Sequence, residues 1–231
     1  FFQVPTTILA QIDSSVGGKV AIDLPGGKNL AGAFYQPKGV FIDPDLLDTL
    51  PTRYVHDGLA EALKYGCIGD PELFELLENI GSEEDLRNHM EEIILRSVLQ
   101  KKKFVEEDRY DNGSRQMLNF GHTIGHAIER YFNYSTYTHG EGVAIGMCLL
   151  TEQTERLGIT EKGTAERVIR AVHHLSLPTS IAVPALELIP QIMHDKKRRG
   201  GEITLVVLDK IGKAHLLKVK TSELDKYIVT E

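Results

Sequence analysis

The sequence predicts a mainly α-helical protein of the α+β class, with a small β-containing segment at its N-terminus and a β-hairpin near its C-terminus. Three observations predict this class. Residues 1–43 are rich in glycine and contain short β-like runs. From residue 44 onward apolar residues recur at helical spacing, and residues 202–219 read as two strands around a turn. We therefore divide the chain into a glycine-rich segment over 1–43 and a helical domain over 44–231.

The N-terminal segment contains three short runs that favour strands, FFQV, KVAID and GVFID. Two Gly-Gly-Lys triplets flank KVAID and end at Lys19 and Lys28. This arrangement is typical of two tight turns around a strand, but glycine pairs also let bare backbone and two ammonium groups approach an anionic ligand. Neither triplet continues as the GK[ST] of a Walker loop, so these residues alone leave both interpretations open.

Helical periodicity follows along most of the remaining chain. Asp70-Pro71 and Gly81-Ser82 separate successive helices, because both pairs are typical helix-start signals. A short closing helix at 221–228 has Thr221 or Ser222 as its expected N-cap. The other helices are expected at 44–50, 53–66, 71–80, 83–107, 114–131, 140–158, 164–174 and 186–197.

Composition and charge exclude several classes of function. The net charge of −7 argues against a general nucleic-acid binder, so any phosphate must be captured by a local basic cluster. The longest apolar stretch, residues 143–150, is too short to span a bilayer, and no signal peptide is visible. Cys67 and Cys148 lie in apolar helical contexts without metal-ligand spacing. We expect buried thiols and a cytoplasmic protein that binds neither nucleic acid nor membranes.

The helix expected to begin at residue 114 carries the most informative polar pattern. Four polar residues share one stripe at i, i+4, i+7 and i+11: Arg115, Asn119, His122 and His126. A solvent-facing surface is the alternative, and Glu129 and Arg130 partly fit it. Solvent faces usually carry Lys, Glu and Gln, and two helix-weakening glycines lie beside this stripe, so we favour a functional site.

A carboxylate and several imidazoles indicate a metal site. Glu61 lies on an otherwise apolar helix, so its burial requires a counter-charge, either Lys64 at i+3 or a metal ion. His139 precedes a later helix and is either a cap-region residue or a ligand. One Glu and two His from separate helices would form a three-ligand zinc site with an open position, which is typical of catalytic zinc. His122 and His126 could instead chelate together, although a threonine stands where zinc proteases carry Glu.

Basic residues complete the candidate site. Runs at 101–103 and 195–199 are more often solvated surfaces, but a small phosphorylated substrate needs several converging cations. The candidates are Lys19, Lys28, Lys64, Lys101, Arg115, Lys196 and Lys197.

Six motifs together resemble the 3-dehydroquinate synthase family. They are QVPTTILAQIDSSVGGKVAID, PGGKNLAGAFYQP, GLAEALKYG, LNFGHTIGHAIE, HGEGVAIGM and DKK, in family order along essentially the whole chain. The resemblance implies that family's fold and the conversion of the keto-acid phosphate DAHP to 3-dehydroquinate and phosphate in the shikimate pathway. The implied steps are transient oxidation at C5 by NAD, β-elimination of phosphate, re-reduction, ring opening and intramolecular aldol closure.

The resemblance also implies roles for individual residues. Implied zinc or cobalt ligands are Glu61, His122 and His139, and the implied acid/base residue is His126. Implied substrate contacts are Asp13, Lys19, Asn29, Lys64, Lys101, Arg115, Asn119 and one of Lys196 and Lys197. Implied NAD contacts are Thr6, Thr7, Lys19, Lys28, Leu46, Leu47, Asp48 and Thr49. Lys19 would then lie where cofactor and substrate meet, and Lys28 on the cofactor side.

The resemblance further implies a homodimer and a nucleotide-binding domain ahead of residue 1. Residues 1–43 would then border the cofactor–substrate cleft, and the chain alone would be inactive. The alternatives are another sugar-phosphate cyclase, a polyol dehydrogenase of the broader superfamily, and a non-catalytic helical interaction module. A basic cluster would be superfluous in a polyol dehydrogenase, and the intact ligand set argues against the interaction module.

Overall fold

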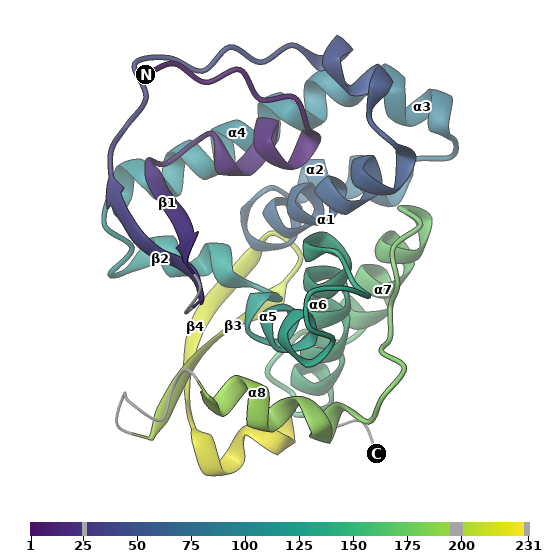
Figure 1. Ribbon diagram of the computed structural model, residues 1–231. Helices are drawn as coiled ribbons and strands as arrows, with labels where there is room; N and C mark the ends of the chain where they lie inside the picture. The colour runs from purple at the N-terminus through teal and green to yellow at the C-terminus, as the bar shows by residue number, and fades with distance from the viewer. Residues whose placement is uncertain (25–26, 195–200, 229–231) are drawn as a thin grey trace.

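The structure, a computed structural model, describes residues 1–24, 27–194 and 201–228, and only the backbone of residues 23, 27–30 and 194. Helices make up most of the described chain, and a two-stranded antiparallel sheet lies near each end (Figure 1). The predicted class, mainly helical α+β, is therefore confirmed. In the described part of the chain, no helix combines the length and the apolar character that crossing a membrane requires.

Among the described residues, helical structure forms in every predicted range, partly as short 3₁₀ helices, and local signals mark several of the helix starts. Asp70 caps α2 by accepting a hydrogen bond from the Leu73 amide at 3.0 Å, and Ser82 caps α3 by accepting from the Asp85 amide at 3.1 Å. The helices are α1 (Thr52–Gly69), α2 (Pro71–Glu78), α3 (Glu83–Asn88), α4 (Met90–Glu107), α5 (His122–Tyr131), α6 (His139–Arg156), α7 (Thr164–His174) and α8 (Ile189–His194). Shorter 3₁₀ helices lie at Pro44–Thr49, Ser114–Asn119, Ala185–Leu188 and Thr221–Tyr227, and a single π-helical turn at Ala10–Ser14.

The N-terminal sheet differs from its prediction. The run KVAID forms β1 (Lys19–Leu24), and its partner strand is β2 (Gly27–Phe34). The sequence predicted a turn at the start of this second stretch but no strand after it. FFQV and GVFID contribute one parallel bridge, between Gln3 and Val40, and no strand. The β2 sequence is rich in glycine and alanine and has low strand propensity, so its pairing with β1 creates the strand.

The C-terminal hairpin follows its prediction. Strand β3 (Glu202–Lys210) pairs antiparallel with β4 (Lys213–Lys220) around a turn that contains Gly212. The middle of β3 is buried, because the hairpin packs against α1 and α6. The 3₁₀ helix that follows has no side-chain N-cap, so the capping role expected for Thr221 or Ser222 is wrong.

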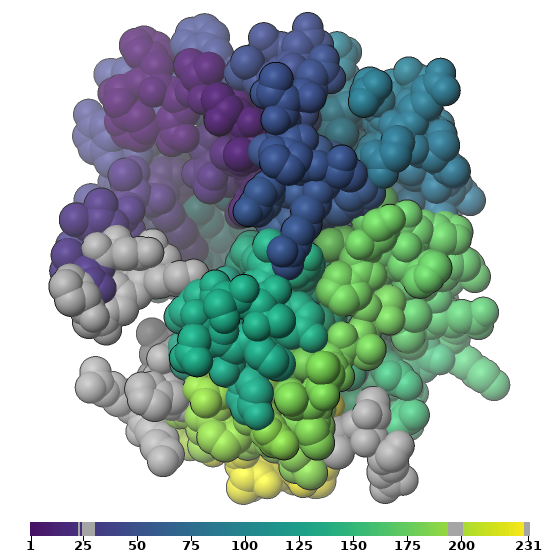
Figure 2. All heavy atoms as spheres, turned by 45° about the vertical axis from the view of Figure 1, so that its right-hand side comes forward, coloured from purple at the N-terminus to yellow at the C-terminus, as the bar shows by residue number. Residues whose placement is uncertain are grey.

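Helix α1 forms the centre of the molecule, with every residue from 56 to 68 buried. It contacts α2, α4, α6 and α7 as well as both strands of the C-terminal hairpin. In the space-filling view, teal atoms of the middle of the chain lie between the purple and blue N-terminal part and the green and yellow C-terminal part (Figure 2). Cys67 and Cys148 are buried and free, as expected. The residue on α1 that the sequence offers as a ligand, Glu61, therefore lies deep in the protein.

Two long helices predicted from periodicity are each divided in two. The helix expected over 83–107 breaks at His89 into α3 and α4. The helix expected over 114–131 begins as a 3₁₀ helix and restarts as α5 after Gly121, which has a φ of 77°. A Cβ on Gly121 would lie 2.6 Å from the Val143 carbonyl oxygen, so the turn depends on glycine both for its conformation and for its space. The prediction that Arg115, Asn119, His122 and His126 share one continuous helical face is therefore wrong.

Candidate metal and substrate site

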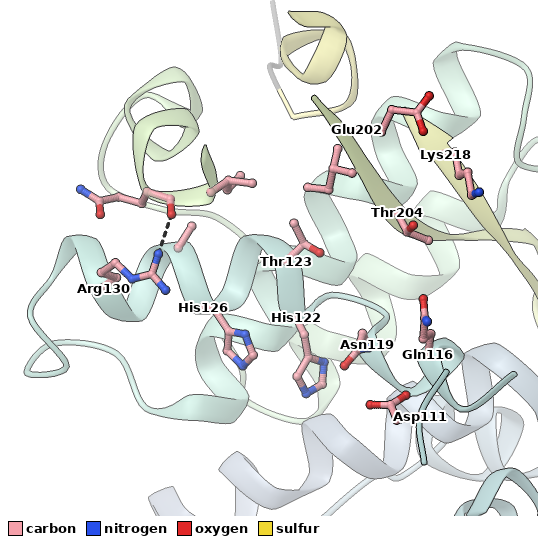
Figure 3. A pocket seen from close by; sticks show the side chains of 14 residues that line it. Asp111, Gln116, Asn119, His122, Thr123, His126, Arg130, Glu202, Thr204 and Lys218 are labelled. Atoms are coloured by element: carbon pink, nitrogen blue, oxygen red, sulfur yellow. Dashed lines mark hydrogen bonds between the residues drawn. The ribbon is translucent and has the colours of Figure 1, made fainter. Parts of the chain in front are cut away.

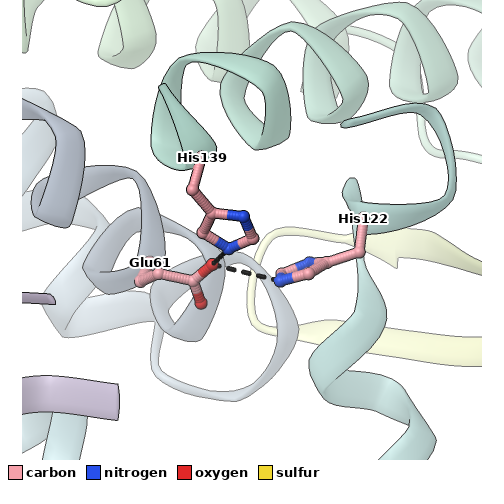
Figure 4. Close-up of side chains that lie close together, drawn as sticks. All are labelled: Glu61, His122 and His139. Atoms are coloured by element: carbon pink, nitrogen blue, oxygen red, sulfur yellow. Dashed lines mark ion pairs between the residues drawn. The ribbon is translucent and has the colours of Figure 1, made fainter. Parts of the chain in front are cut away.

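Three elements bring one carboxylate and two imidazoles together. Glu61 comes from the middle of α1, while His122 and His139 are the first residues of α5 and α6. The Nε2 atoms of His122 and His139 lie 3.2 and 3.3 Å from the Oε1 atom of Glu61. Figure 4 shows all three side chains pointing at one another. Their ligand atoms lie within 4.8 Å of one another, which is close enough for one cation to contact all three.

Glu61 is held as a carboxylate in a fully buried position. Its Oε2 atom accepts a hydrogen bond from Lys64, which is itself 1% exposed. Burial alone would raise the pKa of Glu61, but the Lys64 ammonium group and the nearby imidazoles of His122 and His139 outweigh it and hold the pKa well below its usual range. Lys64, one of the two counter-charges that the sequence suggested for Glu61, thus lies beside it, and so do the two histidines proposed as metal ligands.

The donor set fits a divalent metal ion. Among the described residues, Glu61 Oε1 has no hydrogen-bond partner although it is buried, and two imidazole nitrogens face it. A buried, unsatisfied carboxylate oxygen is costly, and a cation bound between these atoms would remove that cost. One carboxylate and two imidazoles are ligands that suit zinc and cobalt, and three protein ligands leave a position open for a substrate.

His139 is charged in the absence of a metal ion. Burial opposes a positive charge on this ring, but the nearby carboxylates of Glu129 and Glu61 outweigh it and raise the pKa of His139 to about 10. A metal ion that binds here must therefore displace a proton.

His126 lies next to this group but, among the described residues, it does not join it. The centroids of the His122 and His126 rings are 5.4 Å apart, and the rings meet edge to face. The His126 ring lines an open cavity, but the surrounding protein still removes part of its hydration, and this is the largest cause of its lowered pKa. The charges of His122 and His139 lower the pKa further, to about 4. His126 is therefore a neutral imidazole at pH 7 and can accept a proton.

The cavity beside His126 has a volume of about 520 Å³. His122, His126 and Asn119 lie along one side of it, and Thr204 and Lys218 of the C-terminal hairpin lie on the other (Figure 3). Its lining is mainly polar, which suits a small hydrophilic ligand rather than an apolar one.

A second cavity, of about 550 Å³, contains the acidic and basic residues predicted for the substrate. Asp13, Lys19, Lys101 and Arg115 all line it. The carboxylate of Asp13 accepts hydrogen bonds from Lys101 at 2.5 Å and from the Tyr65 hydroxyl at 2.6 Å. Burial raises the pKa of Asp13, but Lys101 outweighs this effect and the net pKa is lowered. Burial also lowers the pKa of Lys101.

The two other cations of this cavity are held in different ways. Arg115 is 2% exposed, and its guanidinium donates to the carbonyls of Gly17 and Arg109 at 3.0 Å. Its Nε atom is buried and has no partner among the described residues. Lys19, at the start of β1, is half-exposed and pairs with Asp111 at 2.5 Å. Tyr65, which donates to Asp13, directly follows Lys64 on α1, so this basic group adjoins the metal-ligand group.

Apart from Lys19 and Lys28, the residues predicted to contact NAD lie on two neighbouring segments. The Gln11 amide donates to the carbonyls of Pro5 and Asp43, at 3.3 and 2.8 Å, and so ties the two segments together. Their exposed members are Thr6, Leu46, Asp48 and Thr49, whereas Thr7 is half-buried and Leu47 lies in the core. The side chains of Lys28 and Asn29 and the whole of Lys196 and Lys197 lie outside the described residues.

Two residues to which the sequence assigned no role in the site support the histidines. Asp57, one turn before Glu61, is buried and accepts a hydrogen bond from the Gly140 amide at 2.6 Å, which fixes the start of α6 against α1. Glu129 fitted a solvent-facing surface in the sequence, but it is 7% exposed and lies 3.6 Å from the Nδ1 atom of His139. Its spacing of i+7 from His122, which repeats after two helical turns, is the signal that could have placed it on the same face.

Comparison with protein-family models gives two matches. Residues 58–198 match a model described as 3-dehydroquinate synthase C-terminal, and residues 1–57 match one described as 3-dehydroquinate synthase N-terminal. Among curated relatives, the 3-dehydroquinate synthase of Clostridium acetobutylicum is 51% identical over 99% of this chain and 64% of its own length. That of Enterococcus faecalis is 45% identical over 100% of this chain and 65% of its own length. The chain thus spans a little less than two thirds of these relatives.

Solved structures of related enzymes share the fold. The 2-epi-5-epi-valiolone synthase of Streptomyces hygroscopicus, with NAD⁺ and Zn²⁺ bound, is 27% identical with a TM-score of 0.86, over 97% of this chain and 64% of that one. A 2-deoxy-scyllo-inosose synthase, complexed with carbaglucose-6-phosphate, NAD⁺ and Co²⁺, is 26% identical with a TM-score of 0.84, over 98% and 66% of the two chains.

Proposed function

The chain belongs to the 3-dehydroquinate synthase family, and on this premise we propose that the protein containing it converts DAHP to 3-dehydroquinate and phosphate. The observation that carries this proposal is the convergence of Glu61, His122 and His139 beside His126 and a buried basic cluster. The identity of 44 to 51% to relatives named 3-dehydroquinate synthase supports the same substrate.

The cofactors of the proposed reaction are NAD and one zinc or cobalt ion. Glu61, His122 and His139 would hold the metal ion, and the exposed residues of the segments around Thr6 and Thr49 would border NAD. When bound, the metal ion polarises the substrate oxygen at C5, and NAD accepts and later returns a hydride. The structural relatives that carry NAD⁺ with Zn²⁺ or Co²⁺ support this pair of cofactors.

His126 is the proposed acid/base residue. Its neutral imidazole lines the cavity beside the metal-ligand group, where a substrate hydroxyl on the metal ion would lie. Its lowered pKa keeps the ring neutral at pH 7, so one ring nitrogen has a lone pair available to the substrate hydroxyl. Its closest imidazole neighbour, His122, is a proposed ligand, so the proton acceptor and the metal ion would act on one substrate group.

The basic cluster would bind the carboxylate and phosphate of the substrate. Lys101 and Arg115 are buried, so their interactions with an anion would be weakly screened by water. Asp13, which also accepts a hydrogen bond from the Tyr65 hydroxyl, holds Lys101 in place, so the ammonium group is oriented before the substrate arrives. Lys19 is more exposed and lines the same cavity. Lys64, beside Glu61, and Asn119, beside the histidines, complete the proposed contacts.

A direct assay tests this proposal. The full-length protein, supplied with NAD and zinc, should release one phosphate and form one 3-dehydroquinate for each DAHP consumed, without net reduction of NAD. Chelation of the metal should stop the reaction, and added zinc or cobalt should restore it. Absence of phosphate release from DAHP in the metal-loaded protein would contradict the proposal.

A related sugar-phosphate cyclase is the second candidate, because the two structural relatives above are cyclases of other names. A substrate that lacks the carboxylate would leave part of the buried basic cluster unpaired, which is unfavourable. Parallel assays with DAHP and with a carboxylate-free sugar phosphate separate the two candidates.

We also propose that residues 1–43 border the cofactor cleft and that residues 44–231 bind metal and substrate. The placement of Lys19 beside Lys101 and Arg115 supports this division, since it brings the first segment to the wall of the substrate cavity. The family resemblance supports a homodimer, which sedimentation of the full-length protein would test.

A further inference from the structure

Both proposed imidazole ligands have an acceptor on the ring nitrogen that does not face the metal site. The Nδ1 atom of His122 lies 3.0 Å from the backbone carbonyl oxygen of Phe120. A carbonyl can only accept, so Nδ1 must carry the proton, and Nε2 would be the ligand atom of a metal ion bound between this ring and Glu61. The turn at Phe120 and Gly121 places this carbonyl behind the ring.

The second imidazole, His139, has a carboxylate in the equivalent position. Its Nε2 atom faces Glu61 Oε1 at 3.3 Å, and its Nδ1 atom faces Glu129 Oε2 at 3.6 Å. The ring therefore lies between two carboxylates, one on the metal side and one behind it. Glu129 belongs to α5, two turns after His122, so one helix supplies both a proposed ligand and the group behind another ligand.

We propose that Glu129 is a positioning residue that holds the Nδ1 proton of His139 and thereby directs the Nε2 lone pair at the metal ion. Metal-bound histidines almost always donate their second ring N–H to a carboxylate, a backbone carbonyl or water, and this contact raises ligand basicity. His122 uses a carbonyl and His139 uses Glu129. This inference rests on the proposed metal site.

The burial of the Glu129 carboxylate supports a role for its charge. Glu129 is 7% exposed, and a buried carboxylate is unfavourable unless a cation or proton donor compensates it. Packing alone requires no charge here. The ligand atoms of His126, Glu129 and His139 also lie within 4.8 Å of one another, so a second metal ion bound to Glu129 is the rival explanation that a test must separate.

Zinc affinity of the full-length protein tests the proposal. A chromophoric chelator competes for zinc, and the dissociation constant is measured for the wild type, Glu129→Gln and Glu129→Ala. We expect Glu129→Ala to weaken zinc binding about 10- to 100-fold, and Glu129→Gln to weaken it less because its amide oxygen still accepts. The absorption spectrum of bound Co²⁺ should also change in Glu129→Ala, because the orientation of one ligand ring is lost.

Glu78→Gln is the matched control, because Glu78 is also 7% exposed but binds Arg167 and Arg170 on α7. We expect it to lower the unfolding midpoint without changing the zinc dissociation constant. Equal zinc affinities in Glu129→Ala and the wild type would overturn the proposal, as would an equal loss of affinity in Glu78→Gln.

The binding stoichiometry separates the remaining outcomes. Two zinc ions in the wild type and one in Glu129→Gln would overturn the proposal, because Glu129 would then be a ligand. A wild type that binds no zinc would overturn both this inference and the metal site. Zinc binding that is lost in Glu61→Ala but unchanged in Glu129→Ala would overturn this inference alone.

Discussion

His126 is proposed to transfer a proton without binding the metal ion, so its substitution distinguishes the two roles. It is adjacent to the metal-ligand group but outside it, and its lowered pKa keeps it neutral. We expect His126→Ala to retain one zinc ion in the full-length enzyme and to lower kcat by about 10²- to 10⁴-fold, the usual contribution of a general acid or base. Turnover and zinc content measured on the same preparation check this. Loss of zinc would show instead that His126 is a ligand.

Glu61 couples the site to the stability of the core. Its partner Lys64 is 1% exposed, so Glu61→Ala would leave a buried ammonium group without its carboxylate. Breaking a buried ion pair in this way costs about 3–5 kcal/mol, which urea unfolding of the metal-free protein would measure. Glu106→Ala is the control, because it removes one partner of an exposed pair, with Lys102, and should cost less than about 0.5 kcal/mol. A similar loss in both variants would contradict this account.

Sequence reasoning located the site residues only partly. The spacing of His122, His126 and His139 left two ligand pairs open, and the resemblance to a known family chose between them. Distances among α1, α5 and α6 decide which side chains meet, and no single helix encodes those distances. Glu129 resembled a solvent-facing residue because it precedes an arginine near a helix end. Its burial depends on α6, whose position the sequence did not predict.

At the scale of elements, the start of α6 must approach α1 closely to place His139. The Gly140 amide donates to Asp57, and a Cβ at Gly140 would collide with the Asp57 backbone oxygen. We expect Gly140→Ala to separate the two helices, to cost about 1–3 kcal/mol and to weaken zinc binding. Unfolding and zinc titration would measure both effects.

Gly81→Ala provides the control for this prediction. Gly81 lies between α2 and α3, and an added Cβ there would meet no atom within 4 Å. We expect a change of less than about 0.5 kcal/mol and unchanged zinc affinity. Equal behaviour of the two variants would show that the close approach of α6 to α1 does not position His139.

Element boundaries were least predictable where tertiary contacts override local preference. Helical periodicity continues through residues 114–131, but Gly121 adopts a left-handed conformation because α6 packs directly against it. Strand β2 has a glycine- and alanine-rich sequence that favours no strand, and it forms by pairing with β1. The long helices and the C-terminal hairpin were predictable, because their periodic patterns extend over several turns or residue pairs.

At the scale of the whole molecule, the site lies where separate parts of the chain meet. Helix α1 supplies Glu61 and Lys64 from the centre of the core, α5 and α6 supply the histidines, and β1 and α4 bring Lys19 and Lys101. Stability of the whole fold and geometry of the site therefore depend on the same packed helices. Ion pairs remote from the site should affect stability without affecting metal binding, and Glu78 is the clearest example.

Glu78 should make the stability of the molecule depend on acidity. Burial raises its pKa, but hydrogen bonds from Arg167 and Arg170 outweigh burial and lower the net pKa below its usual value. The unfolded chain therefore binds a proton at Glu78 at a higher pH than the folded chain does. The stabilisation is complete above the unfolded pKa, about 4.5, and is lost as the pH falls through the lower folded pKa.

We accordingly expect Glu78→Gln to cost about 1.5–3 kcal/mol at pH 7, the range for hydrogen bonds to a charged group, and progressively less below pH 4.5. Urea unfolding of both proteins across this pH range measures the difference, and other carboxylates cancel because both proteins share them. Glu166→Gln on α7 is the control, since that side chain is 84% exposed and lies 4.0 Å from Arg170. A cost for Glu78→Gln that is the same at pH 7 and pH 3 would mean that packing, rather than the charge of Glu78, joins α2 to α7.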